Sequence, residues 1–157
     1  MNTSKKLPGE QLEALSRTLR QLHSLVLQAE KAFHPPAAGL ELLDRLVRDP
    51  AWAWLRPLSA LIADIDHVLA ESQPPTEYDL AVAAAHAREL LAGGGDAGNA
   101  QFVERYRGLL QLSPDLASMH GEVKGLLKTA PPESDDEAER LHYRHQWAMR
   151  CKHQMRG

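Results

Sequence analysis

Apolar residues recur every three or four positions along most of the chain, which is the period of an amphipathic α-helix. The longest such run predicts one helix over residues 8–33. Its apolar positions are Leu12, Leu15, Leu19, Leu22, Val26, Ala29 and Phe33. Because this seam spans fewer than about four heptads, we expect the helix to lie in the protein's own bundle rather than to form a coiled-coil dimer.

The most apolar stretch of the chain contains two of its three tryptophans. Asp49 and Pro50 form a helix-start signal, because an Asp side chain can accept a free backbone N–H and proline loses no hydrogen bond in the first turn. Pro57 cannot donate to the helical ladder and predicts a kink. We therefore expect a short helix with Trp52 and Trp54 that bends into a long central helix. One face of the central helix would carry Leu58, Ile62, Ile65 and Leu69.

Proline, glycine and capping residues divide the remaining chain into further helices. Thr76 and Asp79 resemble a capping box, and Ser113 followed by Pro114 is another helix start. The glycine-rich segment 93–99 has no strand before it and no Lys-Ser/Thr after it, so we interpret it as a linker rather than a phosphate-binding loop. A short helix before the central one would carry Leu40, Leu43 and Val47. The later helices would bury Phe102, Tyr106, Leu109, Leu110, Leu116, Met119, Val123, Leu126 and Leu127.

No segment alternates apolar and polar residues between turn signals, so the sequence predicts no strand. We expect an all-α protein, an irregular bundle of six or seven helices with a proline-kinked central helix. Residues 1–132 would form the bundle core. Residues 133–157 would form a basic C-terminal helix that packs on the same single domain or extends from it.

Composition narrows the class of protein. The chain of 157 residues has 43% hydrophobic and 25% charged residues, which is typical of a folded domain, and its net charge of −3 makes nucleic acid an unlikely partner. The single Cys151 excludes an internal disulfide. Two lysines near the start have no apolar segment behind them, and no run is long enough to span a membrane, so we expect a cytoplasmic protein with no membrane partner.

In the C-terminal segment, acidic residues come first and basic residues follow. Five acids occupy residues 133–139, with Ser134 as the expected helix cap, and from Arg140 onward the chain carries only basic charges. Complementarity to the helix dipole alone can produce this order. A basic helix with an aromatic residue between its cations also suits a macromolecular contact. The predicted partner-binding residues are Trp52, Trp54, Arg56, Arg144, Trp147 and Arg150.

The same helix offers an alternative function. At steps of three, four and four residues, one face could present imidazoles and a thioether to a transition metal. These candidate metal ligands are His142, His145, Met149 and His153. Cys151 could be activated by the neighbouring Arg150 and Lys152, but no base or oxyanion hole can be assigned to it. We therefore expect no cofactor and no catalytic residue.

The central stretch and its surroundings also suggest a resemblance. The pattern Asp49-Pro50-Ala51-Trp52-Ala53-Trp54-Leu55-Arg56-Pro57-Leu58-Ser59-x-Leu61-Ile62-x-x-Ile65-Asp66, with the preceding leucine-rich helix and Phe102-x-x-Arg105-Tyr106, resembles a group of small bacterial proteins of uncharacterised function. The resemblance covers about residues 12–112. It implies an all-helical fold and a bacterial cytosolic setting, and it implies no activity and no site residues.

These observations favour a non-enzymatic, cytoplasmic protein-binding or regulatory module whose partner is another protein. Formation of a homodimer is left open. A transition-metal-binding protein is the alternative. A small-ligand pocket lined by Trp52, Trp54 and Tyr106 is a third hypothesis, because apolar pockets leave little trace in a sequence.

Overall fold

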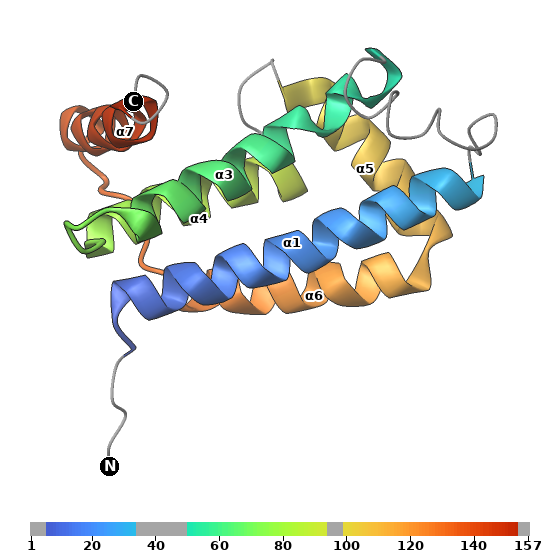
Figure 1. The fold of residues 1–157 in the computed structure, drawn as a ribbon, viewed down its shortest axis with the longest axis horizontal. Coiled ribbons are helices and arrows are strands. Elements are labelled where there is room, and N and C mark those ends of the chain that lie inside the picture. The colour runs from blue at the N-terminus through green and yellow to red at the C-terminus, as the bar shows by residue number, and fades with distance from the viewer. Residues whose placement is uncertain (1–5, 34–49, 94–98, 154–157) are drawn as a thin grey trace.

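The computed structural model of the protein describes residues 6–33, 50–93 and 99–153, without the side chains of residues 50–52 and 153. Figure 1 shows its helices, and no strand occurs in these ranges, so the predicted all-α bundle is confirmed. The elements are α1 (Pro8–Phe33), the 3₁₀-helix η1 (Pro50–Leu55), α3 (Arg56–Ala70), α4 (Glu77–Ala92), α5 (Ala100–Leu112), α6 (Pro114–Thr129) and α7 (Glu137–His153). The predicted short helix of Leu40, Leu43 and Val47 and the cap at Asp49 lie outside the described residues.

The helix α1 is the spine of the bundle. It contacts α3, α4, α5 and α6, and its predicted apolar seam is buried from Leu12 to Ala29. The prediction was wrong for Phe33, which is 43% exposed, because the last three residues of α1 face solvent. The seam therefore ends one turn earlier than the apolar pattern suggests.

The tryptophan segment changes helix type where a bend was predicted. The 3₁₀-helix η1 ends at Leu55, and α3 starts at Arg56 with Pro57 in its first turn, where a missing N–H costs no hydrogen bond. Trp54 is buried, with its ring 5.9 Å from that of Phe102 and the Arg105 guanidinium 5.9 Å over it. The indole N–H of Trp54 finds no hydrogen-bond partner among the described residues.

Side-chain caps fix the starts of the later helices. Thr76 and Asp79 form the predicted capping box of α4, and the Ser113 hydroxyl accepts the Leu116 N–H at the start of α6. The predicted cap of α7 is corrected. The Asp136 carboxylate, rather than Ser134, accepts the first-turn N–H of Glu139 at 3.1 Å. Ser134 instead accepts the N–H of Asp136, which turns the chain into the helix.

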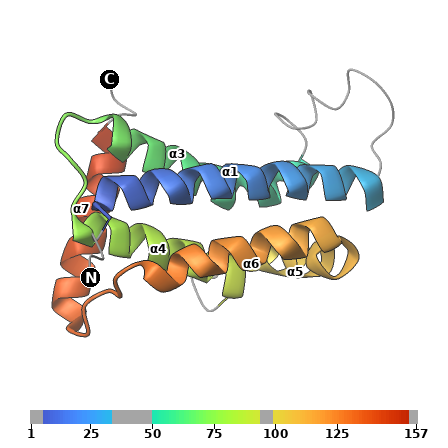
Figure 2. The same cartoon turned by 90° about the horizontal axis from the view of Figure 1, so that it is seen from below.

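The last helix crosses the end of the bundle. Figure 2 shows α7 running crosswise to the other helices at one end of the bundle, and Figure 1 shows that it lies on the side of α3 and α4, with which it makes its main contacts. Trp147 is the one buried residue among its described side chains, and it joins the common core. No described helix is both long and apolar enough to cross a membrane.

Because Trp54 is buried, its replacement should destabilise the folded protein. Trp54→Ala should lower the free energy of unfolding by about 3–5 kcal/mol, because it empties a large core site. Trp54→Phe should cost less, about 1–2 kcal/mol, since a ring remains against Phe102 and an N–H without a described partner is removed. Urea unfolding followed by far-ultraviolet circular dichroism measures both. Equal losses for the two variants would contradict this placement.

Candidate functional site

The structure gives the predicted partner-binding residues different positions. Trp54 and Trp147 are buried in the core, and Arg56 is exposed at the start of α3. The side chain of Trp52 lies outside the described part. Arg144 and Arg150 form ion pairs within the protein, as described next, and their contact with a partner stays a prediction.

Two arginines attach α7 to the bundle. The Arg144 guanidinium donates to both oxygens of Glu133, at 2.7 and 2.8 Å, and to Glu89 on α4 at 2.7 Å. Arg150 donates to Glu71 at 2.7 Å, to the Asp79 carboxylate and to a backbone carbonyl in the α3–α4 connection. The hydrogen bonds to Glu133 and Glu89 raise the pKa of Arg144 further above its ordinary value. Such charge-assisted, forked bonds fix geometry as well as adding energy.

The predicted metal ligands lie on the outer side of α7. His142 and His145 are exposed, and so is Met149, while the side chain of His153 is outside the described part. His142 places its ring edge-on to Tyr143, with the ring centroids 5.2 Å apart. The described residues contain no group of three or more His, Cys, Asp or Glu side chains that could hold a metal ion. The metal hypothesis remains a prediction that depends on His153.

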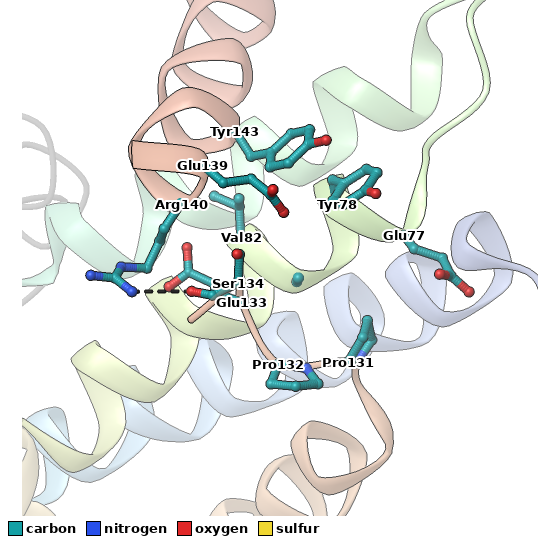
Figure 3. A pocket seen from close by; sticks show the side chains of 11 residues that line it. Glu77, Tyr78, Val82, Pro131, Pro132, Glu133, Ser134, Glu139, Arg140 and Tyr143 are labelled. Carbon is teal, nitrogen blue, oxygen red and sulfur yellow. Dashed lines mark hydrogen bonds between the residues drawn. The ribbon is translucent and has the colours of Figure 1, made fainter. Parts of the chain in front are cut away.

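A pocket of about 210 Å³ opens beside α7 (Figure 3). Its walls come from the first turns of α4, from the Pro131–Ser134 connection and from the first turns of α7. The apolar part consists of Tyr78, Ala81, Val82, Pro131, Pro132 and Tyr143. The polar part consists of Glu77, Glu133, Ser134, Glu139 and Arg140. The pocket therefore combines an aromatic and proline-lined surface with several carboxylates.

Two stacked tyrosines form the most distinctive part of the pocket. The rings of Tyr78 on α4 and Tyr143 on α7 are parallel within 4°, and their centroids are 3.8 Å apart. The hydrogen bond between their hydroxyl groups raises the pKa of Tyr143. Tyr78 remains 50% exposed although it is stacked. A large, rigid and accessible aromatic surface of this kind is typical of binding sites.

Interactions of α7 with the connection before it shape the pocket. Arg144 fixes Glu133, and Arg140 donates to the backbone carbonyl of Ser134 at 3.0 Å, which is the dashed line in Figure 3. These contacts bring the proline-containing connection against the first turns of α4. Two of the residues predicted from sequence to touch a partner, Arg144 and Trp147, thus position the pocket instead of lining it.

A larger pocket, of about 350 Å³, lies between α1, α4 and α6. Its wall is mostly leucine and alanine, and Lys6 is its only charged side chain among the described residues. It offers volume but few groups that could orient a ligand. The pocket beside α7 has more polar groups to confer specificity, and for that reason we treat it as the candidate functional site.

A polar cluster lies beneath α7. The Cys151 thiol donates a hydrogen bond to Asp64 on α3, and Asp64 also interacts with His67 and His86. Burial, and next the charge of Asp64, raise the pKa of Cys151 to about 12. His67 is buried, and its Nε2 atom has no hydrogen-bond partner among the described residues. The cysteine is therefore a protonated thiol at neutral pH and not an activated nucleophile.

One serine lies beside a histidine, as in some hydrolases. His23 Nε2 is 2.9 Å from the Ser59 hydroxyl oxygen. In the described ranges no carboxylate binds the other ring nitrogen of His23, and the Ser59 hydroxyl also donates to the Leu55 carbonyl at 3.4 Å. Nucleophilic catalysis requires a third group to orient the base, so this pair alone does not form a catalytic site.

Comparisons with known proteins assign no function. No protein-family model, curated protein or solved structure matches the chain. The candidate site therefore depends on the geometry described above.

Sequence reasoning missed the pocket. Tyr78 and Tyr143 lie on helices far apart in the chain, and in the sequence Pro131 and Pro132 indicate only the end of a helix. One signal was present in the sequence. Tyr78 is a large aromatic residue in the otherwise polar first turn of a helix whose buried face is made of alanine and leucine.

The raised pKa of Cys151 predicts slow thiol chemistry. At about pH 8, a disulfide reagent should react with the native thiol at least about tenfold more slowly than with the urea-unfolded chain, because little thiolate is present in the folded protein. Asp64→Asn removes the second cause of the shift and should speed the native reaction. Equal rates in the native and unfolded chains would contradict the partly buried position of this thiol and its raised pKa.

Three histidines predict loss of stability in weak acid. Burial lowers the pKa of His23, His86 and His120 below 6.5, and for His86 the charge of Arg144 adds to this effect. The unfolded chain therefore binds protons before the folded one does, so stability is lost as the pH falls through about 6.5. The thermal midpoint should drop by a few degrees between about pH 7.5 and 5.5. His86→Gln should flatten this dependence, and a midpoint that rises toward acid would contradict it.

Proposed function

We propose that this protein is a protein-binding module that captures one side chain of a partner's extended segment in the pocket between α4 and α7. The observation that carries the proposal is an open pocket with apolar walls and, at its edge, two stacked tyrosines, of which Tyr78 is exposed. Tyrosine is enriched among the residues that dominate binding energy at protein interfaces. A pocket that receives one anchor side chain is a common arrangement of such interfaces.

The size of the pocket supports a side chain rather than a large ligand. Its volume is about 210 Å³. Sites for drug-sized molecules are larger, about 300–1,000 Å³. The pocket is also open on one side, so an anchor residue could enter while the rest of its chain stays on the surface.

The rigidity of the pocket walls also supports binding. The capping box of Thr76 and Asp79 fixes the first turn of α4, and Asp79 in turn pairs with Arg150 of α7. Tyr78 lies between these two anchored residues. A site whose side chains are held in place before binding loses less conformational entropy when the partner binds.

Selection from a displayed library of random linear peptides tests the proposal. Peptides selected on the full-length protein should bind Tyr78→Ala at least about tenfold more weakly, because truncation of an aromatic anchor typically costs about 2 kcal/mol or more of binding energy. Fluorescence polarisation with the labelled peptides measures the affinities.

The matched control is Leu141→Ala. Leu141 lies on α7, is 58% exposed and does not line the pocket. This variant should bind the peptides as the unmodified protein does, and circular dichroism should show that both variants fold. Peptides that bind Tyr78→Ala as tightly as the unmodified protein would place binding elsewhere and overturn the proposal.

A further inference from the structure

We infer that the side chain captured by the pocket between α4 and α7 is a lysine or arginine of the partner protein. This inference rests on the proposed function and specifies the chemistry that the pocket selects. Three features of the pocket lead to it, namely its apolar walls, its carboxylates and the way in which the nearby helix N-termini are already capped.

The apolar walls of the pocket fit the methylene chain of a lysine or arginine side chain. Tyr78, Ala81 and Val82 come from one face of α4, and Pro131 and Pro132 face them from the connection. Lysine and arginine bury three or four methylene groups along apolar surface while they keep the charged group at the rim. A tyrosine ring also attracts a cation placed over its face.

The available charge at the rim is negative. The Glu139 carboxylate lies beside the tyrosine pair in Figure 3, and it forms no ion pair with any residue in the described ranges. Glu133 is already neutralised by Arg144. Arg140, the only cation that lines the pocket in the described part, extends away from Glu139 and donates to Ser134. A cationic group beside Glu139 would therefore meet an available carboxylate rather than a competing cation.

The helix N-termini at this site could in principle attract an anion instead. Both α4 and α7 begin at the pocket, and the N-terminus of a helix favours negative charge. Here the protein's own acids already serve this role, through the capping box of α4 and through Asp136 of α7. The first turns add Glu77, Glu137 and Glu139. An anionic ligand would face these carboxylates, whereas a cationic one complements them.

The peptides selected on the full-length protein test the inference through their composition and by substitution. Those that depend on Tyr78 should share a lysine or arginine at one position. In a synthetic copy, replacement of that residue by norleucine, which keeps the aliphatic stem and removes the charge, should weaken binding about tenfold or more. Added salt should reduce the difference, because the charge lies at a solvated rim.

A variant of the protein identifies the carboxylate. With Glu139→Gln, the lysine and norleucine peptides should bind with nearly equal affinity. Glu137→Gln is the matched control, because it removes an acid from the same helical turn that does not line the pocket, and it should preserve the preference for lysine.

The outcomes separate the two proposals. Tyrosine-dependent peptides that share no lysine or arginine, or that bind equally well with norleucine, would overturn this inference and leave the protein-binding function standing. A selection that yields no tyrosine-dependent peptide would overturn the proposed function, and the inference with it.

Discussion

The position of α7 depends on one buried tryptophan and on two arginines that are paired within the protein. Among the described side chains of this helix, Trp147 is the one that is buried, and Tyr143 and Cys151 pack partly buried against the core. Arg144 and Arg150 supply forked bonds to α4 and to the connections on either side of the bundle end. Loss of either guanidinium would leave carboxylates such as Glu133 or Asp79 poorly solvated and without a counter-charge, which is costly. The pocket wall follows from this attachment, because α7 supplies part of it.

Most of the fold could be predicted from the sequence because local signals agree with the tertiary structure. The seam of α1, the capping box at Thr76 and the Ser113-Pro114 start each act through neighbours a few residues away. The errors also have local causes. Phe33 follows the helical period but lies past the last turn that other helices cover. At the start of α7 several residues could act as caps, and the geometry of the preceding turn selects Asp136 over Ser134.

The candidate site could not be predicted in the same way, because its residues meet only through the packing of α7 across the bundle. Asp79 illustrates the difficulty. Its role in the capping box follows from its spacing to Thr76, but its second role, as a partner of Arg150, requires a contact between distant segments. Basic residues on a C-terminal helix suggest a surface, yet Arg144 and Arg150 are paired within the protein. The charge pattern of a sequence shows which side chains need a counter-charge, but only the fold shows which side chains supply it.

The position of the pocket on two helices also couples binding to the attachment of α7. A molecule that touches both α4 and α7 binds only the arrangement in which α7 lies against the bundle end. By thermodynamic linkage, such a ligand must stabilise that arrangement by an amount that grows with its concentration relative to its dissociation constant. The same coupling works in reverse, so any change that loosens α7 lowers the apparent affinity of the site in proportion to the fraction of molecules in which the helix is detached.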